Sequence, residues 1–231
     1  MWDNHQALTS LANWLFALAA LIVSYLITQL TINSPLFPLK EVSLGGNDGG
    51  LKHVTREQID GVVRNAVAGN FFTVDLEATR KAFVKLPWVR TASVRRIWPH
   101  GLEVTLEEHM ALARWGSSAL VNFQGEIFNA ASDEPLPEFE GPEESSSEMA
   151  RQYTVFKKVL QPLHQNIARM SLSDRRAWRV HLDNGTILEL GREQVGVRLK
   201  RYVQVHDHST VQLNQQLTYV DLRYPSGFAV R

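Results

Sequence analysis

The longest charge-free stretch of this chain lies near its N-terminus. No Asp, Glu, Lys or Arg occurs from Asn4 to Leu39, and residues 11–32 are dominated by Leu, Ile, Val, Ala and aromatic side chains. About 20 predominantly apolar residues span the hydrocarbon core of a bilayer, and each charge at its centre would cost roughly 2.5–3.5 kcal/mol. Residues 11–32 are therefore predicted to form a transmembrane helix, preceded by a short tail at 1–10.

Two alternatives to a membrane anchor are disfavoured by the sequence. A cleaved signal peptide begins with basic residues and ends at a small-residue cleavage site. This chain begins Met-Trp-Asp-Asn-His, and the Ala-x-Ala pattern of this region, 17–19, lies inside the apolar run. A core helix of a soluble domain is less uniformly apolar. Neither flank carries a cluster of Lys or Arg, so charge does not decide the orientation; a cytoplasmic tail is inferred because every segment able to fold follows the helix.

Residues 34–108 are predicted to form a small α+β module. An alternating strand pattern is followed by a Gly-rich turn whose glycines lack the order of a phosphate-binding loop. Thr55 and Gln58 form a capping box before an apolar helical stripe, and Asp75 can cap a second helix. The turn sequence 98–101 then separates two strands. The order strand, helix, helix, strand, strand predicts two helices on one side of a short sheet.

Residues 109–231 are predicted to form a mixed β-rich domain with flanking helices. The sequence around Asp183-Asn184-Gly185 is typical of a hairpin, and a three-residue loop with Gly185 left-handed would align one apolar face. Two cross-strand pairs result from this register: Val180 with Leu188, and Trp178 with Leu190. Asn184 also begins a glycosylation sequon, which matters only in a cell that performs the modification.

The rest of this region alternates between polar and apolar segments. Ser132–Glu148 contains seven acidic residues and three prolines, so it is predicted to be an exposed loop. One helix is expected after it, and a basic helix is expected at roughly 192–206. A strand at 219–224 precedes a Pro-Ser-Gly turn and a last strand, Phe228–Val230. We expect this last strand to be an edge, which natural proteins shield or use to bind a strand of a partner.

Composition excludes several classes of function. The chain has 24 Lys and Arg, 24 Asp and Glu, and no Cys, which argues against a nucleic-acid binder and against thiol, disulfide or Cys-based metal chemistry. From Met149 to Arg231 there are 13 basic and six acidic residues, which indicates either a surface for acidic partner segments or a solvated face. His206 and His208 point in different directions on a helix, and Ser226 lacks a nucleophile elbow. No catalytic residue, metal site or cofactor is predicted.

Short motifs along nearly the whole chain resemble the FtsQ/DivIB family of bacterial cell-division proteins. Each is weak alone, but their order, their spacing and the preceding membrane helix make the combination specific. The motifs are Phe37–Val42, Leu86–Val89, Val94–Pro99, Leu102–Val104, Ala113–Trp115, Leu190–Arg192 and Tyr219–Tyr224.

The resemblance implies an architecture and a cellular role. It implies a single-pass protein of the bacterial inner membrane with a cytoplasmic N-terminus, concentrated at the division septum. Its periplasmic part would comprise a POTRA domain (34–108) and an FtsQ-type β domain (109–231). Such a protein is an essential, non-enzymatic scaffold that recruits FtsB and FtsL and is linked through them to septal peptidoglycan synthesis by FtsW and FtsI. No nucleic acid or small-molecule substrate is implied.

The resemblance also implies a binding site, because in the family a segment of FtsB adds a strand to the last strand of the β domain. The residues that correspond are Tyr224, Ser226, Gly227, Phe228, Ala229 and Val230, with Arg175 and Arg176 facing partner carboxylates. Two other classes are kept as alternatives: an inner-membrane accessory protein of assembly or secretion that uses a POTRA module, and a membrane-anchored periplasmic hydrolase.

Overall fold

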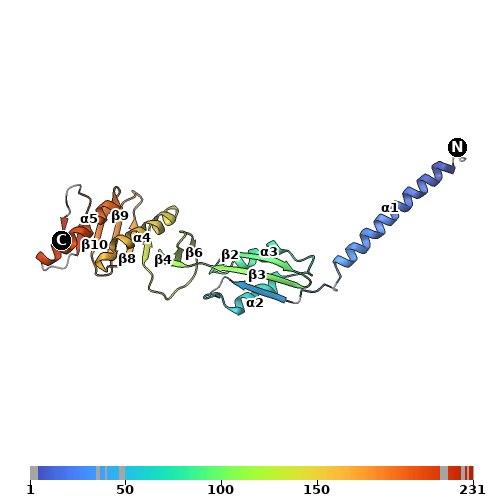
Figure 1. Ribbon diagram of the computed structural model, residues 1–231, viewed down its shortest axis with the longest axis horizontal. Coiled ribbons are helices and arrows are strands. Elements are labelled where there is room, and N and C mark those ends of the chain that lie inside the picture. The colour runs from blue at the N-terminus through green and yellow to red at the C-terminus, as the bar shows by residue number, and fades with distance from the viewer. Residues whose placement is uncertain are drawn as a thin grey trace. The chain divides into compact units, whose positions relative to one another are not determined.

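The computed structural model describes residues 5–34, 37–39, 41–46, 50–213, 218–224, 227 and 229–230. The chain divides into two compact units, Met1–Glu108 and His109–Arg231. Its class is α+β, as predicted. Figure 1 shows the helices and strands in chain order.

Helix α1 (His5–Ile32) forms over the charge-free stretch and ends where predicted, but it begins six residues before the predicted start at residue 11, so part of the predicted tail 1–10 is helical. In the part of the chain that is described, it is the one helix long and apolar enough to cross a membrane, over Leu8–Ile32 with a mean hydropathy of 2.1. Its large apolar side chains are exposed, as expected of a surface that faces lipid. At 1.5 Å per residue these 25 residues extend about 38 Å, more than the roughly 30 Å of a hydrocarbon core.

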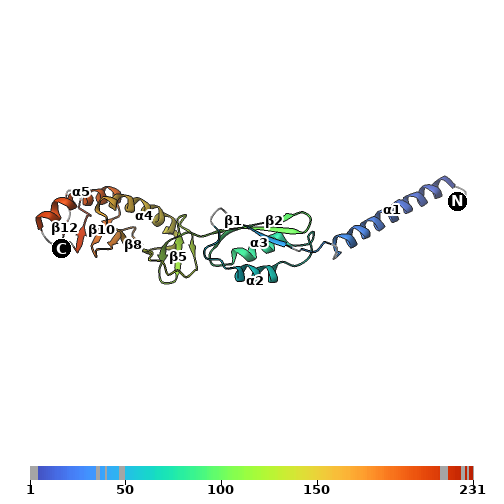
Figure 2. The ribbon, with the colours of Figure 1, turned by 60° about the horizontal axis from the view of Figure 1, so that its bottom comes forward.

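The three-stranded module follows α1 within the first unit. Its elements are β1 (Glu41–Gly46), α2 (Arg56–Ala66), α3 (Leu76–Val84), β2 (Val89–Ile97) and β3 (Gly101–Glu108). The described strands are ordered β1-β3-β2, with β3 parallel to β1 and antiparallel to β2. Figure 2 shows α2 and α3 on the same side of this sheet, as the sequence predicted.

Local signals in the sequence explain where the helices of this module begin. The Thr55 hydroxyl accepts a hydrogen bond from Gln58 N, and the Gln58 side chain accepts one from Thr55 N, so the predicted capping box is confirmed. The Asp75 carboxylate caps α3 by accepting a hydrogen bond from Ala78 N. The apolar faces of the helices then pack on the sheet around Phe83 and Val104, both fully buried.

The nine-stranded domain is the second unit. In its described residues the strands are ordered β12-β11-β10-β9-β8-β7-β4-β5-β6. They are β4 (Ala111–Trp115), β5 (Ala119–Asn122), β6 (Ile127–Phe128), β7 (Glu138–Glu140), β8 (Ile167–Leu172), β9 (Trp178–Leu182), β10 (Ile187–Gly191), β11 (Tyr219–Asp221) and β12 (Ala229–Val230).

Two helices cover one face of this sheet. Helices α4 (Ser146–Leu160) and α5 (Val195–Leu213) lie on the same side of the strands (Figure 2). Short 3₁₀ helices flank α4 at Glu143–Ser145 and Gln161–Leu163. The basic helix predicted at roughly 192–206 is α5, which begins three residues later and ends seven residues later than expected. The core between helices and sheet is fully buried, and its members include Phe156, Leu160, Met170, Val180, Leu188 and Leu199.

The prediction that Ser132–Glu148 is an exposed loop is wrong for half of this segment. It contains β7, which lies in the interior of the sheet between β4 and β8 and is parallel to both. It also contains a 3₁₀ turn and the first residues of α4. A three-residue strand with two paired neighbours needs only one apolar side chain facing the core, and Phe139 provides it. Glu138 and Glu140 face solvent, so the strand cannot be recognised from the acidic composition of the segment.

The predicted hairpin is correct in its loop and in one of its two pairs. Gly185 has a φ of +90°, and Leu188 pairs with Val180. However, Trp178 pairs with Gly191 and not with Leu190, because the register shifts by one residue between Glu189 and Gly191. Such a β-bulge adds one residue to a single strand, which a uniform register cannot anticipate.

The carboxylate of Glu108 joins the end of β3 to the segment before α2. It accepts hydrogen bonds from three backbone N–H groups, those of Lys52 (2.9 Å), His53 (2.9 Å) and Val54 (2.7 Å). Burial raises the pKa of Glu108, but the three backbone donors together outweigh it, so that the pKa lies below its ordinary value.

We expect Glu108→Gln to lower the free energy of unfolding of the three-stranded module by about 2 kcal/mol at neutral pH, because hydrogen bonds to a charged acceptor are lost. A carboxylate with a lowered pKa stabilises the fold above its unfolded-state pKa, and this contribution disappears as the pH falls through the folded-state value. The difference between wild type and variant should therefore shrink below about pH 4. Denaturation at several pH values and hydrogen exchange of the amides of residues 52–54 measure it.

The neighbouring variant Glu107→Gln is the matched control. Glu107 pairs with Arg90 on the exposed side of the same strands, and such pairs contribute at most about 1 kcal/mol. Equal effects of the two substitutions would contradict the role given to Glu108.

Candidate partner-binding site

Strand β12 lies at one end of the nine-stranded sheet. It pairs antiparallel with β11, through Val220 with Val230 and Asp221 with Ala229, and no other described strand pairs with it. The Val230 side chain is 43% exposed. The predicted edge strand is thus an edge strand, although Phe228 lies outside the described residues. An edge of this kind presents backbone N–H and C=O groups to which another strand can pair.

The segment between β11 and β12 carries the second predicted group of site residues. Tyr224 is 54% exposed, and its carbonyl oxygen accepts a hydrogen bond from Arg201 Nη1 on α5 (3.1 Å). Gly227 is half-buried. Ser226, another predicted contact, lies outside the described residues. The structure therefore brings Tyr224 and Gly227 to the point where the chain enters β12.

Arg175 and Arg176 occupy the turn between β8 and β9. The turn is closed by a hydrogen bond from Ser173 N to Ala177 O (3.0 Å), and Arg176 adopts a left-handed φ of +64°. Both side chains are exposed. Arg176 forms an ion pair with Glu148 in the first turn of α4, whereas Arg175 makes no ion pair with any residue that the structure describes.

The two groups of predicted residues lie at the same end of the sheet but are not in contact. β10 is antiparallel to β9 and parallel to β11, so the start of β9, the end of β10 and the end of β11 coincide. Three strand spacings separate β9 from β12, which amounts to about 14 Å. One extended segment of a partner is long enough to contact both groups.

A basic cleft lies between them, and sequence reasoning did not find it. This cleft has a volume of about 320 Å³ and is lined by Ala177, Gly191, Arg192, Glu193, Arg198 and Arg223. Of its three arginines, Arg192 directly follows β10, Arg198 lies on α5 and Arg223 is the second residue after β11. Arg198 Nη1 donates to Leu190 O (2.6 Å), which fixes the guanidinium beside the cleft. The signal in the sequence was the basic surplus after Met149, but only the parallel β10–β11 pairing brings these residues together.

Arg223 is held in place by the strand that precedes it. Its guanidinium donates to both carboxylate oxygens of Asp221, at 2.6–3.0 Å. Asp221 is buried, and the hydrogen bonds from Arg223 hold its pKa below the ordinary value against the effect of burial. The pair is therefore charged at neutral pH, and Arg223 is one of the residues that line the cleft.

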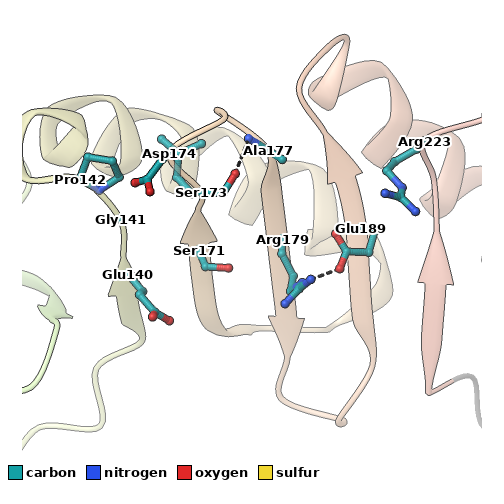
Figure 3. Close-up of a pocket in the computed structure, with 11 residues that line it drawn as sticks. Glu140, Gly141, Pro142, Ser171, Ser173, Asp174, Ala177, Arg179, Glu189 and Arg223 are labelled. Carbon is teal, nitrogen blue, oxygen red and sulfur yellow. Dashed lines mark hydrogen bonds and ion pairs between the residues drawn. The ribbon is translucent and has the colours of Figure 1, made fainter.

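A larger cleft lies on the helix-free face of the sheet and offers no evident chemistry. This cleft has a volume of about 680 Å³. Figure 3 shows the residues that line it, which include Glu140, Ser171, Asp174, Arg179, Glu189 and Arg223. Arg179 and Glu189 neutralise each other at 2.5 Å. No group of three His, Asp or Glu residues among the described positions could hold a metal ion.

Comparisons with known proteins all point to one family of cell division proteins. The family model described as "POTRA domain, FtsQ-type" matches residues 37–109, and the one described as "Cell division protein FtsQ/DivIB, C-terminal" matches residues 113–223. A protein named cell division protein FtsQ from Nitrosospira multiformis is 64% identical, over 100% of this chain and 99% of the relative. Proteins of the same name from Burkholderia pseudomallei (41% identical; 100% and 94%) and Neisseria gonorrhoeae (36%; 100% and 95%) are also similar.

Two family models thus cover most of the chain, one on the three-stranded module and one on the nine-stranded domain, and relatives match it over its full length. This chain belongs to the FtsQ/DivIB family of cell division proteins.

Proposed function

We propose that this protein is a cell-division scaffold of the bacterial inner membrane that recruits the FtsB–FtsL complex by β-strand addition to β12. The observation that carries the proposal is the edge position of β12 beside a cleft with three arginines. Strand addition supplies main-chain hydrogen bonds, and side-chain pockets and charges next to the edge supply specificity. A strand-forming segment with acidic residues fits both features.

The charges around the site support an acidic partner. Arg175, Arg192 and Arg198 present guanidinium groups at one end of the sheet, and such groups bind carboxylates in a planar, bidentate manner. The guanidinium of Arg223 is already paired with Asp221. A partner segment that pairs with β12 would run past Tyr224 toward this cleft. An excess of one charge also accelerates the encounter of the two proteins.

The membrane helix supports the localisation that we propose. Helix α1 would anchor the protein with its N-terminal end in the cytoplasm and with the three-stranded module and the nine-stranded domain in the periplasm. There it would be concentrated at the septum and linked, through FtsB and FtsL, to FtsW and FtsI and so to septal peptidoglycan synthesis. The family name of the relatives supports the division role.

Tyr224→Ala is expected to weaken binding of the cognate FtsB–FtsL complex at least about 30-fold, because exposed aromatic residues at the centre of an interface often contribute most of the affinity. Tyr219→Ala, half-exposed on β11, is the matched control and should retain binding. Biolayer interferometry gives the dissociation constants, and circular dichroism checks that both variants fold. Unaltered binding by Tyr224→Ala would refute the proposed contact.

Arg175→Glu is expected to weaken the same complex by roughly tenfold at low salt, through a slower association rate, and by less as salt screens the charge. Arg175 is the sharper choice because reversing Arg176 would also break its ion pair with Glu148. Lys158→Glu, exposed on α4, makes the same change in net charge away from the site. If the association rates of both variants fell equally, the effect would be a general one of net charge, and this result would contradict a local contact at Arg175.

A fluorescent fusion of the full chain is expected to form a band at mid-cell in dividing bacteria, because the proposed partners assemble there. A uniform fluorescent rim would show a membrane protein without a septal location and would remove the division role. Microscopy of cells that express the fusion at native level distinguishes the two patterns.

A further inference from the structure

The side chain of Asn70 joins the end of α1 to the three-stranded module. Its Nδ2 group donates hydrogen bonds to the carbonyl oxygens of Ile32 (2.6 Å) and Ser34 (3.2 Å). Its Oδ1 atom accepts from the backbone N–H groups of Phe72 (2.9 Å) and Thr73 (3.0 Å). Asn70 is only 9% exposed. The 70–74 loop is therefore held against the last turn of α1, whose carbonyl groups otherwise lack partners within the helix.

The turn between β2 and β3 is held beside the same loop. Arg96, the next-to-last residue of β2, donates from Nε to Phe71 O (2.7 Å) and from Nη2 to Val74 O (2.9 Å). The turn at 98–100 follows one residue later. Two segments distant in sequence, 70–74 and 97–101, thus lie together next to the end of α1.

Both segments expose large apolar side chains. Trp98 is 80% exposed, Phe72 is 45% exposed and Ile97 is 41% exposed. Phe37 packs edge-on against Phe72, with ring centroids 5.0 Å apart. We call these four residues the aromatic patch. The sequences 69–74 and 97–101 contain no Asp, Glu or Lys, so no carboxylate of these segments opposes contact with an apolar or anionic surface.

The length of α1 sets the depth of this patch. The span Leu8–Ile32 is about 8 Å longer in total than the hydrocarbon core, so in a centred helix the carbonyl group of Ile32 lies about 4 Å outside the core, in the headgroup region of a bilayer. This region is about 5–7 Å thick on each side and is the zone in which Trp side chains gather in membrane proteins. The Asn70 contact ties the 70–74 loop to this depth, and Arg96 ties the turn with Trp98 to the loop.

We propose that the aromatic patch inserts into the headgroup region of the bilayer that α1 spans, so that the three-stranded module is docked on the lipid surface. The occupant is phospholipid, because the patch is continuous with the end of the membrane helix. This proposal applies on whichever side of the membrane the module lies, and it does not depend on the proposed partners.

Labelling of a single cysteine tests the proposal directly. The chain contains no cysteine, so Trp98→Cys in the full-length protein gives one reactive thiol for the fluorophore NBD. Val84→Cys is the matched control, because Val84 is also an exposed apolar residue of the module but lies at the end of α3, near the start of β2. Both proteins are reconstituted alone in nanodiscs that contain phospholipid with doxyl groups near the headgroup.

We expect the label at residue 98 to be quenched by the doxyl lipids at least about twofold more than the label at residue 84, and its emission to be blue-shifted. Equal quenching at the two positions would overturn the proposal. No other protein is present in these nanodiscs. If the patch binds the membrane helix of a partner and not lipid, the two labels should therefore be quenched equally.

A second variant tests the Asn70 contact. Asn70→Ala, combined with the label at residue 98, is expected to reduce quenching toward the value for residue 84, while α1 stays inserted. Asn65→Ala, on the exposed surface of α2, is the control and should leave quenching unchanged. Circular dichroism verifies that both variants fold, and unchanged quenching in folded Asn70→Ala would overturn the role of this contact.

Discussion

The parallel pairing of β11 with β10 is the contact on which the candidate site depends. A parallel neighbour ends where β10 ends, so Arg223 and the approach to β12 lie at the same end of the sheet as Gly191 and the Arg175 turn. An antiparallel β11 would place these residues at the opposite end. The long connection through α5 makes the parallel arrangement possible, because α5 packs on the helix-covered face while the chain returns to the start of the next strand.

The features that could be predicted from the sequence are those coded by neighbouring residues. Capping by Thr55 and Asp75, the end of the apolar helix at Ile32 and the loop before Thr186 each depend on a few adjacent positions. The order of the five elements in the first module follows from the same local signals. For these features a pattern of side chains corresponds to one backbone conformation, and the structure agrees.

The remaining features depend on contacts between residues far apart in the chain. The composition of Ser132–Glu148 could not reveal that Phe139 fills a position in the sheet core, because two neighbouring strands from other segments create that position. The bulge at Leu190 and the convergence of Arg192 and Arg223 likewise exist only once the strands are paired. Local sequence fixes the alternation of a strand but not the identity of its neighbours.

The ion pair between Arg176 and Glu148 gives the site an internal competitor. A carboxylate that arrives from outside would exchange one ion pair for another at Arg176, and the net gain there is small although the contact is specific. Glu148, once released, would face solvent near the start of α4, where the positive end of the helix dipole still stabilises it. Association built on such an exchange is readily reversed.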